Sequence, residues 1–157
     1  MTDYLDASQP LLHSTAPPVP LEAPDVGLLH DGMSDGIRTL RMRITPPPRA
    51  NLLILGANAR ERIVGAAVDG KRVPNDASDD GGRRAWTLNY WSPAPEGVAL
   101  TLEVKGSAPL TLTARAATPG LPVIPGESYR ERPPTMMPQR YEDRTLVSRS
   151  FTFAARS

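Results

Sequence analysis

Apolar and polar residues alternate with a period of two along much of this chain, as in β-strands that have one buried and one exposed face. The pattern first appears at residues 37–45, where polar positions separate Leu40, Met42 and Ile44. Similar short segments follow at 51–56, 62–73, 86–90, 98–104, 110–114 and 146–153. Proline, glycine and acidic residues separate them. The pattern predicts an all-β fold, a two-sheet antiparallel β-sandwich of about seven or eight short strands.

Two of these segments contain turn signals for hairpins. Asp69-Gly70 suits the positive φ angles of a type I′ turn, so residues 62–73 are expected to form one hairpin. Segments 98–104 and 110–114, joined by the short turn "KGSAP", are expected to form a second.

Proline-rich stretches divide the chain. Residues 1–34 carry prolines at positions 10, 17, 18, 20 and 24 and are expected to be an N-terminal arm or linker. The β-sandwich domain then spans residues 35–157. Within it, residues 118–138 are dense in proline and glycine, which predicts a long surface excursion.

Composition narrows the function classes. Eighteen basic and 17 acidic residues give a net charge of +1, too balanced for strong nonspecific binding to nucleic acid. The absence of cysteine excludes disulfides, thiolate metal sites and thiol nucleophiles. No segment approaches the roughly 20 apolar residues of a membrane helix. We therefore expect the isolated chain to be soluble, with no nucleic-acid partner and no direct membrane insertion.

Residues 32–36, Gly-Met-Ser-Asp-Gly, match the G-x-S-x-G pattern of a hydrolase nucleophile elbow. That elbow needs a helix after the serine, whereas a strand is expected after Ser34. The histidines, His13 and His30, both precede Ser34, while the hydrolase triad has its histidine later in the chain. A glycine-rich turn is the better interpretation.

A second motif, Asp76, Ser78, Asp80 and Gly81, resembles the opening of a calcium loop. Thr87 stands at the twelfth position, where an EF-hand has glutamate, so a weak calcium site remains open only as an alternative to a solvated acidic turn. The two histidines lack zinc-ligand spacing, and no phosphate-binding loop motif is present. We expect no metal, no cofactor and no catalytic residues in this chain.

Aromatic and basic side chains supply candidate contact residues. Trp86 and Tyr90 share a strand face with Leu88 and are expected in the core, while Trp91 points to the opposite face. Exposed strand positions and the excursion together give a candidate interaction surface that consists of Trp91, Arg41, Arg43, Tyr129, Arg130 and Arg132.

Five segments, in this order, carry a family resemblance: "RTLRMRITPPPRANLLIL", "VDGKRV", "WTLNYWSPAPEGVALTLEV", "GLPVIPGESYRERPP" and "TLVSRSFTF". Over about residues 20–153 the chain resembles the C-terminal β-sandwich domain of bacterial membrane-anchored zinc aminopeptidases, relatives of the endoplasmic-reticulum metallopeptidase. The matching motifs are structural and not catalytic.

The resemblance implies that the catalytic zinc ligands lie in a separate peptidase domain of a larger parent. This chain would then be a non-catalytic accessory domain on the periplasmic or extracytoplasmic face of a bacterial membrane, with "APPVPLEAP" as a stalk. Its partners would be the peptidase and membrane-spanning parts of the same parent, and it would pack against the peptidase domain or regulate access to it. Two alternatives stay open: a carbohydrate- or ligand-binding module that uses Trp91 and Tyr90, and a free-standing enzyme.

Overall fold

The computed structural model describes residues 15, 17–58, 62–73, 86–126, 128, 133, 135–137 and 143–156. All nine regular elements in this part of the chain are β-strands. They are β1 (Asp25–Ser34), β2 (Ile37–Thr45), β3 (Leu52–Ala57), β4 (Ile63–Val68), β5 (Lys71–Arg72), β6 (Trp86–Trp91), β7 (Val98–Lys105), β8 (Leu110–Pro119) and β9 (Arg144–Phe153). Among the described residues, no helix is long and apolar enough to cross a membrane.

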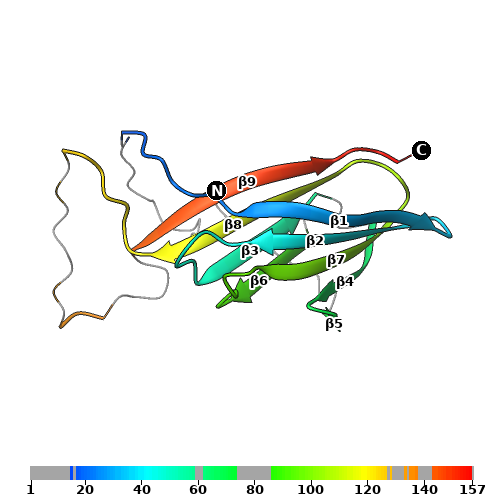
Figure 1. The fold of residues 1–157 in the computed structure, drawn as a ribbon, viewed down its shortest axis with the longest axis horizontal. Helices are drawn as coiled ribbons and strands as arrows, with labels where there is room; N and C mark the ends of the chain where they lie inside the picture. The colour runs from blue at the N-terminus through cyan, green and yellow to red at the C-terminus, as the bar shows by residue number, and fades with distance from the viewer. Residues whose placement is uncertain are drawn as a thin grey trace, which may run out of the picture.

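The strands form two antiparallel sheets that pack face to face (Figure 1). The five-stranded sheet has the order β1-β2-β7-β4-β5, and the four-stranded sheet has the order β6-β3-β8-β9. The predicted all-β sandwich of two antiparallel sheets is therefore confirmed.

The core lies between the inner faces of the two sheets. Alternate residues of β2, β7, β3 and β8 point into it, because successive side chains of a strand point to opposite faces. Its buried aliphatic residues include Leu40, Met42, Ile44, Leu53, Leu55, Leu100, Leu102, Leu110 and Leu112. Burial of these side chains is the main stabilising contribution to the fold.

Residues 25–34, expected in the N-terminal arm, instead form the edge strand β1. β1 pairs with β2 through a two-residue turn in which Asp35 and Gly36 both have positive φ angles, 51° and 75°. The boundary expected at residue 34 thus falls inside a hairpin. Alternation did not predict this strand because Leu28 and Leu29 are both exposed and the register shifts between Leu28 and His30.

The hairpin predicted at Asp69-Gly70 is confirmed: β4 pairs with β5, and the two turn residues have φ angles of 47° and 78°. The second predicted hairpin is wrong. β7 pairs with β2 and β4, whereas β8 pairs with β3 and β9 in the other sheet. The connection at residues 106–109 is therefore an arch between the sheets, because alternation identifies the buried face of a strand but not its partner.

The predicted excursion begins after β8 ends at Pro119, and its described residues form no helix or strand before β9. In Figure 1 this segment, yellow to orange, extends from one end of the sandwich. Residues 17–24, in blue, lead into β1 from the same end.

Candidate interaction surface

Trp91 is the last residue of β6 and lies on the outer face of the four-stranded sheet, with 46 % of its surface exposed. Trp86 at the start of the same strand is buried at 6 % exposure, and Leu88 and Tyr90 pack against the core. The opposite orientations of Trp86 and Trp91 follow from the strand period, so both predictions are confirmed.

A small apolar cluster accompanies Trp91 on this outer face. Leu52 of β3 lies opposite both Trp91 and Ala117, and Ala117 lies opposite Leu146. Leu52 and Ala117 are fully buried although they belong to the outer face, outside the main core cluster. Ile124, from the excursion, is also buried outside that core.

Arg144, the first residue of β9, contacts the Trp91 ring. Its guanidinium carbon lies 5.7 Å from the centroid of the Trp91 ring, which is within cation–π range. Its Nη1 also donates to Asn51 Oδ1 at 3.3 Å. Backbone hydrogen bonds fix Asn51 in place: its N–H donates to Ala117 O, and its carbonyl accepts from Ser92 N–H. The ring is thus held by a polar frame while part of it faces solvent.

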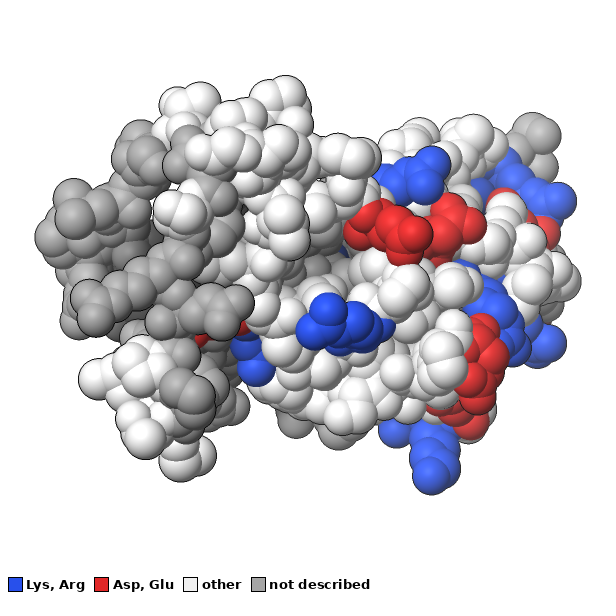
Figure 2. Space-filling model, turned by 60° about the vertical axis from the view of Figure 1, so that its left-hand side comes forward, with Lys and Arg blue, Asp and Glu red and all other residues white. Residues whose placement is uncertain are grey.

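The excursion exposes further large apolar side chains at the same end of the molecule. Leu121, Val123, Met136 and Met137 are all exposed, and Val123 is 90 % exposed. Among the described residues that Figure 2 shows, most Lys, Arg, Asp and Glu side chains lie in the right half of the view. We call these four residues and Trp91 the apolar end.

The structure does not bring Arg41 and Arg43 together with Trp91. Both arginines are exposed on the outer face of the five-stranded sheet, and Arg43 Nη1 donates to Glu96 O at 3.1 Å. Tyr129, Arg130 and Arg132 lie outside the described residues, as does the acidic motif at positions 76–81.

Ser34 lies at the end of β1, where its hydroxyl donates to Asp35 Oδ2 at 3.1 Å. The Asp35-Gly36 turn and then strand β2 follow it. This is the turn expected from the sequence and not the strand–turn–helix geometry of a nucleophile elbow.

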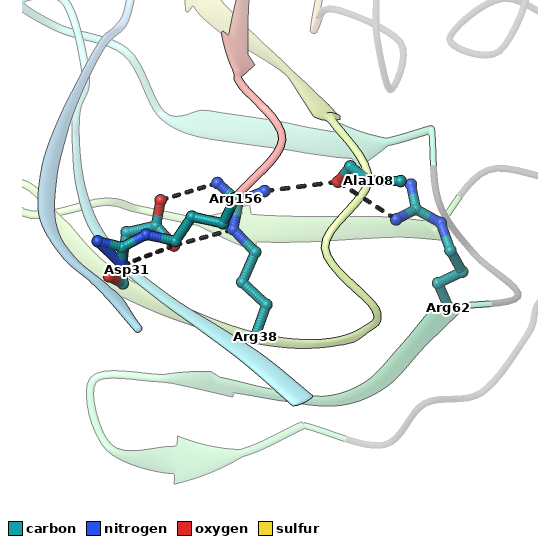
Figure 3. Close-up of polar contacts among 5 residues, drawn as sticks. All are labelled: Asp31, Arg38, Arg62, Ala108 and Arg156. Carbon is teal, nitrogen blue, oxygen red and sulfur yellow. Dashed lines mark hydrogen bonds and ion pairs between the residues drawn. The ribbon is translucent and has the colours of Figure 1, made fainter. Parts of the chain in front are cut away.

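Arg38, the most buried charged side chain among the described residues, lies on the inner face of β2, so grouping it with Arg41 and Arg43 in a solvated basic strand face is wrong. It continues the inward period of Leu40, Met42 and Ile44 and is only 2 % exposed. Its Nε and Nη2 donate to the two carboxylate oxygens of Asp31, at 2.8 and 2.7 Å, and its Nη1 donates to Ala108 O at 3.4 Å (Figure 3).

Two further arginines, Arg156 and Arg62, lie close to the Arg38–Asp31 pair (Figure 3). Arg156 of the C-terminal tail donates to the carbonyl oxygen of Asp31, and its backbone N–H donates to Ser107 O at 3.0 Å. Arg62 donates to the carbonyls of Ala108 and Pro109 at 3.4 and 3.0 Å. The cluster ties β1, β2, the arch and the tail together.

The hydrogen bonds from Arg38 hold the pKa of Asp31 below its ordinary value, against the opposing effect of burial. The same hydrogen bonds raise the pKa of Arg38. Asp31 is thus an ionised carboxylate held by arginines, an arrangement that suits a structural role better than proton transfer.

Residues 15–156, where the structure describes them, contain no group of three or more His, Cys, Asp or Glu side chains placed to hold a metal ion. No protein-family model, curated protein or solved structure matches the chain.

Proposed function

We propose that this chain is a non-catalytic accessory domain of a larger membrane-anchored zinc peptidase, on the periplasmic or extracytoplasmic face of the membrane. It packs against the peptidase domain or regulates access to that domain. The observation that supports this proposal is the apolar end, where Trp91 and the excursion expose large apolar side chains.

The composition of the apolar end is that of a protein contact. Exposed apolar surface is unfavourable in water, and contiguous patches of it mark sites of interaction. Aromatic residues and methionine are enriched in interfaces relative to the remaining surface, and Trp91, Met136 and Met137 are of these types. Arg144 orients the Trp91 ring before any partner arrives, which lowers the entropic cost of binding.

The position of the apolar end supports a partner within the same parent chain. Residues 17–24 lead into β1 at the end from which the excursion extends (Figure 1). A proline-rich stalk is an extended, semi-rigid spacer, and one of nine residues would hold this end within about 28 Å of the part of the parent that precedes it. Such tethering gives a weak apolar contact a high effective concentration.

The coding sequence upstream of Met1 in the source genome tests whether this chain is part of a larger peptidase. The proposal expects a continuous frame that encodes several apolar spans and, before them, a domain with His, Asp and Glu residues at zinc-ligand spacing. A stop codon directly upstream of Met1 would contradict the peptidase parent.

A second candidate function is binding of a carbohydrate or similar ligand at Trp91. It is favoured by one observation: a half-exposed indole ring stands beside the Asn51 amide and the Arg144 guanidinium, a combination of stacking surface and polar groups. Saturable quenching of tryptophan fluorescence by one glycan, lost in Trp91→Phe, would establish this function. Unchanged fluorescence across a glycan panel would remove it.

A further inference from the structure

A shallow hollow of about 190 Å³ lies on the outer face of the five-stranded sheet, whereas Trp91 belongs to the other sheet. Its lining residues come from β4, β7 and the Asp69-Gly70 turn with β5: Ala66, Ala67, Gly70, Arg72, Thr101 and Glu103. Pockets for drug-sized ligands measure roughly 300–1,000 Å³, so this hollow is suited to one small chemical group.

The hollow exists because small side chains at its base leave space above the sheet. Thr101 lies at its centre, opposite Ala67 on β4 and opposite Arg41 on β2. The neighbouring pair is Gly65 and Glu103, and a Cβ on Gly65 would clash with the Glu103 carboxylate, which therefore lies across the glycine. A glycine inside a strand often marks a position where another group approaches the backbone closely.

Two arginines flank this row of residues: Arg41 on β2 pairs with Thr101 just outside the lining, and Arg72 on β5 lies beyond Ala67. Arg41 is exposed and, within the residues that the structure describes, makes no hydrogen bond or ion pair. Arg72 pairs with Glu103 at 3.6 Å, but the Arg72 side chain is 77 % exposed. Exposed pairs of this kind contribute little free energy, so Arg72 is easily transferred to another anion.

We infer that this hollow binds a small organic oxyanion, a carboxylate or phosphate group, between Arg41 and Arg72. The planar guanidinium matches both groups through paired hydrogen bonds, and the Thr101 hydroxyl supplies one further donor. The incoming oxyanion replaces the Glu103 carboxylate on Arg72. Glu103 is therefore a competitor for the same guanidinium.

The test is a titration of the ¹⁵N-labelled full chain with inorganic phosphate and, separately, with acetate, followed by amide chemical shifts. The expected result is a saturable shift of the amides of Ala67, Gly70 and Thr101. Arg41→Gln should weaken binding about tenfold, the loss of one charge-assisted hydrogen bond. Glu103→Gln should strengthen it about two- to fivefold, because the competing carboxylate is gone.

Arg43→Gln is the matched control, since Arg43 lies on the same face of β2, two residues from Arg41, and is also exposed. Its affinity should stay close to that of the unaltered chain. Shifts that do not saturate, or equal weakening by Arg43→Gln and Arg41→Gln, would overturn the site and leave only a diffuse basic field.

Tighter binding of phosphate or of acetate identifies the natural group. All three substitutions are on the surface, and an otherwise superimposable amide spectrum verifies the fold.

Discussion

Arg38 and Asp31 form a two-point ion pair in which the arginine is almost completely buried while the side chain of the aspartate is 19 % exposed. The arginine cannot be hydrated if it loses its partner, whereas the aspartate retains some access to water and also faces Arg156 at 3.9 Å. Loss of the aspartate should therefore cost more free energy of unfolding than loss of the arginine.

Asp31→Ala should destabilise the fold more than Arg38→Met. The first leaves a buried charge unpaired, at a cost of about 3 kcal/mol or more in the free energy of unfolding. The second leaves a partly hydrated carboxylate and keeps apolar packing, at a cost of about 1–2 kcal/mol. Urea unfolding measures both.

The control for this pair is Asp25→Ala, which removes the exposed contact between Asp25 and Arg149 at 3.4 Å. Its cost should be below about 1 kcal/mol. Equal losses in Asp25→Ala and Asp31→Ala would show that the burial of Arg38 does not determine the energetics.

Asp31 should also make stability depend on pH. Its pKa is lowered in the folded state, so the unfolded chain takes up the proton first as the pH falls. The contribution is fully present above the unfolded pKa, about 4, and is lost as the pH falls through the lower folded pKa. The urea midpoints of the natural chain and of Asp31→Asn should therefore converge as the pH falls below about 4. A constant difference would contradict the coupling.

Trp86 and Trp91 should differ in their contribution to stability and in their accessibility to quenchers. Trp86→Ala removes a buried ring from the core and should cost about 3–5 kcal/mol, whereas Trp91→Ala loses mainly its contact with Arg144, about 1 kcal/mol. In acrylamide quenching, Trp91→Phe should leave a protected emission from Trp86. Efficient quenching of that remaining emission would contradict the assigned burial.

The two type I′ turns provide a matched comparison. Asp69 and Asp35 both have positive φ angles, but only the Asp69 carboxylate accepts a backbone hydrogen bond across the fold, from Ala99 N at 2.8 Å. Asp69→Ala should therefore cost about 1 kcal/mol more than Asp35→Ala. Equal costs in urea unfolding would mean that the bond to Ala99 contributes nothing.

Asp69→Ala has a second readout at Tyr90. Desolvation raises the pKa of Tyr90, and the charge and hydrogen bond of Asp69 raise it further. Removal of Asp69 should lower the pKa of Tyr90 towards its ordinary value, as measured by ultraviolet absorbance during alkaline titration. An unchanged pKa would leave desolvation as the whole cause.

The strands were predictable where alternation is regular, as in β2 and β7, because their inward residues, apart from Arg38, are large and apolar. β1 was missed because its apolar side chains are exposed and a register shift interrupts its period. Arg38 fits the inward period, but its charge conceals its burial until Asp31 is seen beside it.

The exposure of Trp91 followed from its place one residue after Tyr90, since neighbours in a strand face opposite sides. The contact of Trp91 with Arg144 could not be predicted from the sequence. The two residues belong to strands that are distant in the sequence and separated in the sheet by β3 and β8. Local periodicity carries no information on which distant segments meet. The same limit explains why the sequence predicts a hairpin where the structure has an arch between β7 and β8.

The apolar end is tested most directly by isothermal titration calorimetry of this chain against the remainder of the parent encoded by the upstream frame. Binding is expected with a negative heat-capacity change, the signature of apolar burial. Trp91→Ala and Val123→Ser should each weaken it, while Val64→Ser, an exposed valine on β4, should not. Absence of binding at about millimolar concentration, which a short tether would supply, or equal affinity for all three variants and the natural chain, would contradict docking through the apolar end.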